Sequence, residues 1–281
     1  HFVTPADIRW ILALTAPRVR MSLRYWDRQL GVDAALLTQS YRALEDILRD
    51  GAAFTRAEIL DGLLHAGIPA APDRMAHLLM HAELEALICS GPRRGKQFTY
   101  ALLAERAPQA RTLSHDDALA ELTRRYFTGH GPATVQDFVW WSGLTTADAR
   151  TGLDMLAGEL AEDVIGGQTM WFADAAAPDA SPTPTAHLLP NYDEYIVGYT
   201  DRGAIFDDAH AGHLDARGNV LFQNTVLLDG QVVGIWKRML KKRSVTLQTT
   251  LFDTFRSDHT PALNRAIAQF GAFLDLPVEM L

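Results

Sequence analysis

One succession of elements occurs twice along this chain, about 80 residues apart, and it constrains the fold more than any other feature. In the first copy, Thr55 and Glu58 form a capping box that opens a helix, and Gly67-Ile68-Pro69 ends it. A second helix is predicted over residues 72–86. Two strands follow, with a tip running from Gly91 to Lys96. The pattern predicts a helix–turn–helix followed by a β-hairpin.

The second copy repeats this plan. A leading helix is predicted over residues 114–130, another over 134–141, and a third from its cap at Thr145 to Leu156. Residues 162–172 then predict a hairpin with a Gly166-Gly167 turn. Because both copies combine helices with short antiparallel strands, we expect fold class α+β.

The flanking segments complete the predicted architecture. Residues 5–30 are typical of a helix interrupted at Ala16-Pro17, and another helix is predicted over 34–48. Residues 174–185 contain three prolines and no large apolar side chain, which indicates a linker. Several strand-like runs and a terminal helix over 261–273 then predict a small β-barrel domain. The strand-like runs cover residues 186–189, 220–228, 232–236 and 245–251.

These patterns divide the chain into four predicted parts. The parts are a helical segment at 1–50, two repeated modules at 51–110 and 111–175, and a C-terminal β-barrel-like domain with its terminal helix at 185–281. A length of 281 residues suits several small domains better than one.

Charge and composition restrict the classes of function. The chain has 26 Lys and Arg against 34 Asp and Glu, a formal net charge of −8, so any contact with nucleic acid must be local. Cys89 is the single cysteine, and no internal disulfide can form. No run approaches the roughly 18 apolar residues that cross a membrane. We therefore expect a cytoplasmic protein without a membrane partner.

Four segments resemble those of a known family. The most specific runs from Leu188 to Arg202 and reads LLPNYDEYIVGYTDR. The other three are CSGPRRGKQ at 89–97, the segment 131–144 with GPAT and WSGL at its ends, and the segment 229–236. In this order they resemble the bacterial winged-helix DNA-binding proteins of the AlkZ/YcaQ-like DNA glycosylase superfamily. The resemblance implies tandem winged-helix modules followed by a β-barrel.

The resemblance also implies an activity, the excision of alkylated bases or the unhooking of interstrand crosslinks. In the family, a Gln-apolar-Gln or Gln-apolar-Asp motif in the first winged helix would orient water and stabilise the cationic sugar. No glutamine of this chain is followed two positions later by Gln, Asp or Glu. The opening His1-Phe2-Val3 resembles the last strand of the family's first module. We therefore expect the chain to lack the N-terminal catalytic winged helix, as a fragment or as a natural short member, and to hold no catalytic residue.

The tip of the first hairpin is one candidate DNA contact. Arg93, Arg94 and Lys96 lie in a stretch, residues 86–104, without a single acid. Neighbouring glycines let the backbone approach phosphates closely. Three phosphate contacts would give log K a salt slope of about −2.7. The alternative is a loop that only improves solubility.

A second basic run lies near the C-terminus. It places five cations between Gln231 and Phe252 without a carboxylate. A hairpin connecting barrel strands could present them to phosphates on the opposite side of the DNA from the first hairpin. The alternative is a solvated turn. The five residues are Lys237, Arg238, Lys241, Lys242 and Arg243.

The family-specific segment contains acids among tyrosines and allows two interpretations. It could line a pocket in which Asp193 orients water and a tyrosine stacks on an extruded base. Alternatively, its Asp and Arg side chains form buried pairs that fix the C-terminal domain to the winged helices. The candidate pocket residues are Tyr192, Asp193, Glu194, Tyr195, Asp201 and Arg202.

The helix predicted over 145–156 would be the recognition helix of the second module. Its expected outward positions carry one cation and two acids, so we expect recognition of DNA shape and backbone rather than of base sequence. These positions are Thr146, Asp148, Ala149, Arg150 and Asp154.

The histidines provide a weak metal signal. His77 and His81 are four residues apart on a predicted helix, and His210 and His213 lie near three aspartates. Neither pair has the glutamate or cysteine neighbours that make such spacing specific. We expect no metal and no cofactor. The sequence as a whole predicts a protein that binds duplex DNA, and the alternative is a protein-interaction or transcription-regulatory module.

Overall fold

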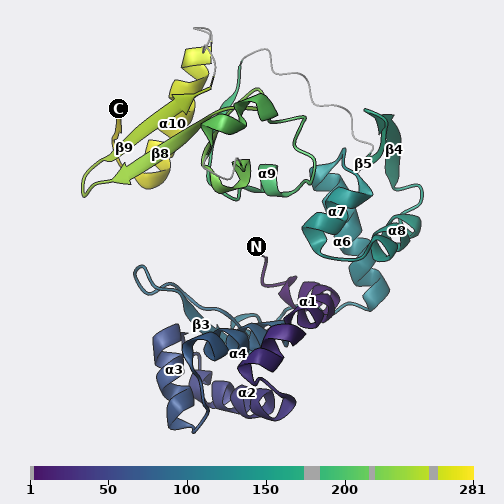
Figure 1. The fold of residues 1–281 in the computed structure, drawn as a ribbon, viewed down its shortest axis with the longest axis vertical. Coiled ribbons are helices and arrows are strands. Elements are labelled where there is room, and N and C mark those ends of the chain that lie inside the picture. The colour runs from purple at the N-terminus through teal and green to yellow at the C-terminus, as the bar shows by residue number, and fades with distance from the viewer. Residues whose placement is uncertain (1–2, 174–183, 215–218, 253–258) are drawn as a thin grey trace. The chain divides into compact units, whose positions relative to one another are not determined.

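The computed structural model describes residues 3–173, 184–214, 219–252 and 259–281. The chain divides into two compact units, one of His1–Gly129 with Ser142–Gly158, the other of His130–Trp141 with Glu159–Leu281 (Figure 1). The finer division into four parts stays a prediction. His1 and Phe2 of the predicted first strand lie outside the described residues, as does most of the predicted linker.

The first unit begins with two long helices. Helix α1 spans Ile8–Leu30 and continues through Pro17, so the interruption predicted there is wrong. A proline inside a helix removes one hydrogen bond, but the buried side chains of Trp10, Leu14 and Ala16 hold the turns that precede it. Helix α2 spans Ala34–Leu48 and is capped by the Asp33 side chain, which accepts a hydrogen bond from the Leu36 amide at 2.8 Å.

The elements of the first copy are present as predicted. Thr55 and Glu58 form the capping box of helix α3, and a three-stranded antiparallel sheet follows in the order β1-β3-β2. The segments are β1 Phe54–Thr55, α3 Arg56–His65, α4 Pro72–Leu84, β2 Ile88–Ser90, β3 Thr99–Leu102 and α5 Leu103–Arg106.

One hydrophobic cluster joins these elements to α2. Leu44 and Leu48 from α2, Ile59 and Leu63 from α3, and Leu78 from α4 are all fully buried in it. Replacing any one of them by alanine would cost about 2 to 5 kcal/mol, because a cavity would remain. The hairpin of β2 and β3 is therefore held by a packed helical base.

The second copy contains the predicted helices and hairpin. They are α6 His115–His130, α7 Val135–Ser142, α8 Thr146–Met155, β4 Leu160–Ile165 and β5 Gln168–Ala173. Strands β4 and β5 pair antiparallel around the Gly166-Gly167 turn, in which both glycines have positive φ. Helices α6 and α7 join the two units along the chain, and α8 belongs to the first unit.

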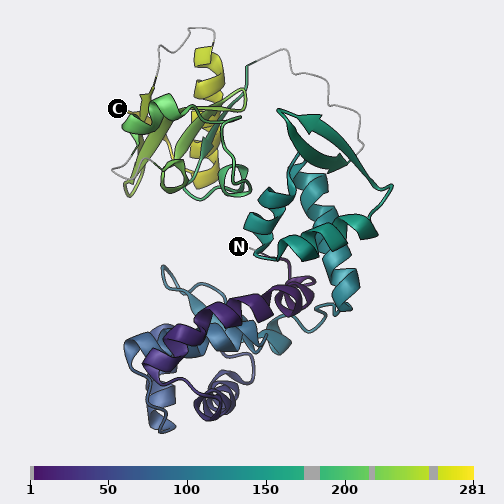
Figure 2. The same cartoon turned by 45° about the vertical axis from the view of Figure 1, so that its right-hand side comes forward.

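The C-terminal domain contains an open sheet, which corrects the predicted barrel. In the described residues the strand order is β10-β9-β8-β7-β6, with β10 and β6 as edges. Closure requires the two edge strands to pair, and here helix α10 packs against the sheet instead (Figure 2). The segments are β6 Ala186–Leu189, β7 Thr225–Leu228, β8 Gln231–Leu240, β9 Val245–Leu251, α10 Thr260–Leu274 and β10 Val278–Met280.

Two apolar clusters stabilise this domain. Leu263 and Ile267 of α10 pack with Val226 and Trp236 of the sheet. A second cluster surrounds the short helix α9, Glu194–Val197, through its buried Ile196. The predicted strand over 220–228 is shorter than expected, because its first residues form a 3-10 helix. Within the described ranges, no helix combines the length and apolar character needed to span a bilayer.

Candidate nucleic-acid interface

The tip of the β2–β3 hairpin is a tight, defined turn. Arg94 and Gln97 exchange both backbone hydrogen bonds at 3.1 Å. Only Gly95 and Lys96 remain between them, and Gly95 has a φ of +62°. A two-residue loop of this kind demands positive φ, which glycine adopts without strain. The turn therefore presents its side chains from a fixed backbone.

The three cations of this tip have different surroundings. The Arg93 guanidinium carbon lies 4.4 Å from the centre of the Phe98 ring. Lys96 is exposed, and no ion pair involves it in the part of the chain that the structure describes. Both side chains are thus available to an anionic partner.

Arg94 differs from its two neighbours. Its guanidinium donates to Glu58 Oε1 and to the Ala53 carbonyl oxygen, both at 2.6 Å. Hydrogen bonds from Thr55 and then from Arg94 hold the pKa of Glu58 below its usual value. The carboxylate comes from α3, outside the acid-free stretch seen in the sequence. Arg94 therefore already has an acidic partner, unlike Arg93 and Lys96 in the described residues, and the contact of all three with DNA stays a prediction.

The second basic run covers the end of strand β8 and the tip of the predicted β8–β9 hairpin. Leu240 pairs with Val245, and the Lys241 amide donates to the Ser244 carbonyl oxygen at 2.9 Å. The Lys241 ammonium contacts Glu279 Oε2 of β10 at 2.6 Å. Arg238 lies over the Phe270 ring of α10 at 5.7 Å. These two cations are therefore partly engaged within the domain.

The remaining cations of this run are exposed. Lys237, Lys242 and Arg243 make no ion pair among the residues that the structure describes. Met239 and Leu240 beside them are also exposed. Because the two hairpins belong to different units, each is a separate candidate surface.

The acidic and tyrosine-rich segment is bound to the neighbouring elements of the second unit. Glu194 accepts hydrogen bonds from Trp141 Nε1 and pairs with His130 Nε2 at 3.0 Å. Asp193 caps α9 by accepting from the Tyr195 amide at 3.0 Å. These contacts favour the structural interpretation of the segment over a catalytic pocket.

The other members of that segment also have internal partners. The Tyr195 hydroxyl donates to the Gly230 carbonyl oxygen at 3.0 Å, and Asp201 accepts from the Gly203 amide at 2.8 Å. Tyr192 contacts Phe222 edge-on, with ring centres 5.5 Å apart.

Arg202 does not form the expected pair with an aspartate. Its guanidinium donates to the carbonyl oxygens of Ile196 and Thr200 at 2.9 and 3.1 Å. Burial lowers the pKa of Arg202. Two of the guanidinium nitrogens of Arg202 are therefore bound by backbone carbonyls, and no ion pair of Arg202 with an aspartate is found among the described residues.

Asp137 connects two segments of the second unit through hydrogen bonds, and the sequence did not predict this role. Its carboxylate accepts from the amide and hydroxyl groups of both Thr134 and Thr200, at 2.7 to 3.0 Å. Burial opposes ionisation, but the bonds from Thr200 and Thr134 outweigh it and lower the pKa of Asp137. The T-x-x-D spacing at 134–137 is a capping-box pattern and could have indicated the Thr134 contact, but not the one to Thr200.

A basic surface on α1 was also missed. Asp27, the single acid of this helix, turns inward and contacts His77 Nδ1 and His81 Nε2 at 3.1 and 3.0 Å. Arg24 and Arg28 remain exposed without an ion pair in the described ranges, beside the half-exposed Tyr25 and Trp26. Five arginines against one aspartate over residues 8–30 is the signal that could have found this surface.

The histidines considered as metal ligands contact other side chains of the protein. His77 and His81 share Asp27, while His210 and His213 stack on Phe252 with ring centres 5.2 Å apart. No cluster of three or more metal-ligating residues suited to an ion was found in the described part of the chain.

Helix α8 presents few groups to a ligand. Asp148 serves in the Thr145 capping box, and Ala149 is fully buried rather than outward as expected. Arg150 and Asp154 remain exposed. That α8 does not read bases directly stays a prediction.

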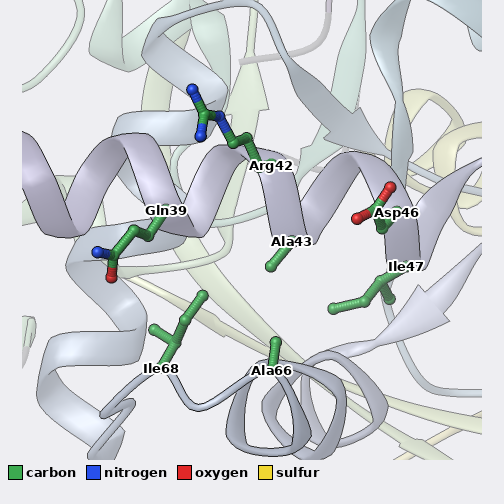
Figure 3. A pocket seen from close by; sticks show the side chains of 7 residues that line it. All are labelled: Gln39, Arg42, Ala43, Asp46, Ile47, Ala66 and Ile68. Atoms are coloured by element: carbon green, nitrogen blue, oxygen red, sulfur yellow. The ribbon is translucent and has the colours of Figure 1, made fainter.

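Two hollows lie in the first unit. In the smaller, about 320 Å³, Ala43 and Ile47 point from α2 toward Ala66 and Ile68, with polar side chains at its rim (Figure 3). The larger, about 740 Å³, is mostly apolar and is lined by α1, α4 and the β2–β3 hairpin, including Phe98. Burial raises the pKa of Glu83, which lines the larger hollow.

Residues 1–273 match the model of the family described as DNA glycosylase AlkZ-like, and the chain belongs to this family. One relative is the interstrand DNA cross-link repair glycosylase of Streptomyces sahachiroi. It is 24% identical over 259 residues, which cover 88% of this chain and 70% of the relative. The solved structure of Streptomyces sahachiroi DNA glycosylase AlkZ superposes with a TM-score of 0.74 at 21% identity, covering 96% of this chain and 76% of that one. The two share a fold.

Proposed function

We propose that this chain binds duplex DNA through the phosphate backbone and that it is the DNA-binding, non-catalytic part of a glycosylase acting on alkylated bases or interstrand crosslinks. The observation that carries the proposal is the presence, on tight hairpin tips, of exposed cations that have no ion pair among the described residues, in a chain whose net charge is −8. Membership of the AlkZ-like family supports the same polyanion as partner.

The arrangement of the first copy supports a winged helix as the binding element. Helices α3 and α4 precede a sheet of order β1-β3-β2, and the β2–β3 hairpin is the wing. The same order of elements from α7 to β5 supports a second winged helix. Wings commonly contact the backbone or the minor groove. In this proposal Arg93 and Lys96 contact phosphates, while Arg94 fixes the wing to α3.

The C-terminal hairpin supplies a second set of contacts in this proposal. In it, phosphates are bound by Lys237, Lys242 and Arg243. A third set of phosphate contacts comes from Arg24 and Arg28 of α1. These cations contact phosphates and not base edges, so binding is independent of base sequence. The acids and tyrosines of residues 192–202 act by holding their domain together.

In the family that this sequence resembles, base excision depends on a Gln-apolar-Gln or Gln-apolar-Asp triplet. No such triplet occurs in this sequence. We propose that a protein carrying this triplet releases alkylated purine and that this chain by itself releases none. Incubation of the chain with alkylated DNA, followed by chromatography of released bases, tests this, and release of purine would contradict it.

Fluorescence anisotropy tests DNA binding itself. A labelled duplex should bind at low salt and dissociate as salt rises, because each phosphate contact releases counterions. The second candidate function, a protein-interaction module, is favoured by the exposed Tyr25 and Trp26 of α1. That candidate predicts no DNA binding at any salt concentration.

A further inference from the structure

Phe98 is an exposed aromatic residue at the base of the wing tip. Its relative exposure is 67%, and it lies outside the hydrophobic cluster of its module, to which Tyr100 two residues later contributes. It also lies on the wall of the larger hollow, so packed side chains do not enclose the ring. The Phe98 ring is therefore largely open to solvent.

Exposure alone indicates nothing, since single exposed apolar residues are normal. The position of Phe98 among cations distinguishes it. The Arg93 guanidinium lies over its ring at 4.4 Å, and Lys96 projects from the adjacent two-residue turn. Residues 86–104 contain no carboxylate, and Glu58 of α3, which reaches this tip, is paired with Arg94.

The support beneath Phe98 is rigid. Arg94 ties the turn to Glu58 and to the Ala53 carbonyl oxygen, and the Thr99 hydroxyl donates to the Pro92 carbonyl oxygen at 2.6 Å. A methyl group on Gly91 would lie 2.5 Å from Thr99 Oγ1, so the two strands approach closely. A side chain on such a rigid hairpin can be pushed between stacked bases without being displaced.

We propose that Phe98 is a wedge that inserts between adjacent bases of duplex DNA while Arg93 and Lys96 hold the flanking phosphates. The inference rests on the proposed function and adds a specific contact to it. Apolar side chains inserted at a base step unstack it and bend the duplex. An aromatic ring stacks on any base, so the wedge requires no base sequence. A hydrophobic pocket of a protein partner would not need the cations around the ring.

The experiment uses the whole chain and a duplex with 2-aminopurine at one central position. The fluorescence of this base rises when it loses its stacked neighbours. The unsubstituted chain should raise the emission at saturation about threefold or more. Phe98→Ala should bind with an affinity within about fivefold of the unsubstituted chain but raise the emission little, because the phosphate contacts persist.

Two further variants provide controls. Phe273→Ala removes a ring that is 82% exposed on α10, and it should behave as the unsubstituted chain. Phe98→Leu keeps an apolar wedge and should retain part of the emission rise. Circular dichroism verifies that each variant is folded.

The outcomes separate the wedge from the proposed function. Binding seen by anisotropy without an emission rise would overturn the wedge and leave DNA binding intact. An equal rise with Phe98→Ala would also overturn it. Absence of binding by the unsubstituted chain would overturn both.

Discussion

The Asp137 carboxylate accepts two hydrogen bonds from Thr200, one from its amide at 2.8 Å and one from its hydroxyl at 2.7 Å. The contact joins α7 to the family-specific segment across 63 residues of sequence. That segment carries the acids and tyrosines first considered as a pocket. The described side chains of that segment make hydrogen bonds to neighbouring elements of the second unit.

Asp137→Asn should destabilise the second unit by about 2 to 3 kcal/mol. An amide has a single acceptor oxygen and cannot accept from both threonines at once. Urea denaturation followed by hydrogen exchange of peptides from the second unit measures the change. Asp154→Asn, at an exposed position of α8, is the matched control, and an equal effect of the two variants would contradict the assigned role.

The same residue predicts a pH dependence. The folded state holds the pKa of Asp137 below its usual value of 3.8. Above pH 3.8 the carboxylate is ionised in both the folded and the unfolded chain, and its contribution to the free energy of unfolding is complete. The contribution is lost as the pH falls below 3.8 through the lower pKa of the folded state. Acid titration of the second unit should therefore be steeper for the unsubstituted chain than for Asp137→Asn. Parallel curves would contradict this.

Arg93 and Arg94 are adjacent in sequence but should differ in their effect on DNA binding. Arg93→Ala should lower the magnitude of the slope of log K against log salt by about 0.9, the value for one phosphate contact. Arg94→Ala should leave that slope almost unchanged, because Glu58 already neutralises the guanidinium. Anisotropy titrations at several salt concentrations measure both slopes, and equal losses would refute the distinction.

Glu279→Gln should strengthen DNA binding. The carboxylate contacts the Lys241 ammonium at 2.6 Å, and this contact comes first among those that lower the pKa of Glu279. Removing the negative charge frees a cation on the β8–β9 tip. The affinity for DNA should therefore rise about twofold to tenfold at low salt. Glu159→Gln, outside this hairpin, controls for the change in net charge, and the gain should be absent there.

The local elements could be predicted from the sequence because their signals are short-range. The Thr55 capping box, the Gly95 turn and the Gly166-Gly167 turn each depend on a few consecutive residues. Pro17 misled the prediction, because packing of Trp10 and Leu14 outweighs the local preference of a proline. Tertiary contacts determine whether a helix continues through a proline.

Long-range relations could not be predicted in the same way. An open sheet and a barrel have the same strand patterns and differ in whether β6 meets β10, a pairing without a local signal. The acid-free stretch around Arg94 predicted a free cation, but Glu58 of α3 reaches it from 36 residues away in sequence. The contact of Asp137 with Thr200 could not be predicted for the same reason, because 63 positions separate the two residues in sequence.

The salt dependence of duplex binding by the 281-residue chain tests the central claim most directly. We predict that log K falls linearly with log salt, with a slope of about −2 or steeper, and that duplexes of different sequence bind alike. Binding that is undetectable at low salt, or that does not change with salt, would contradict the account.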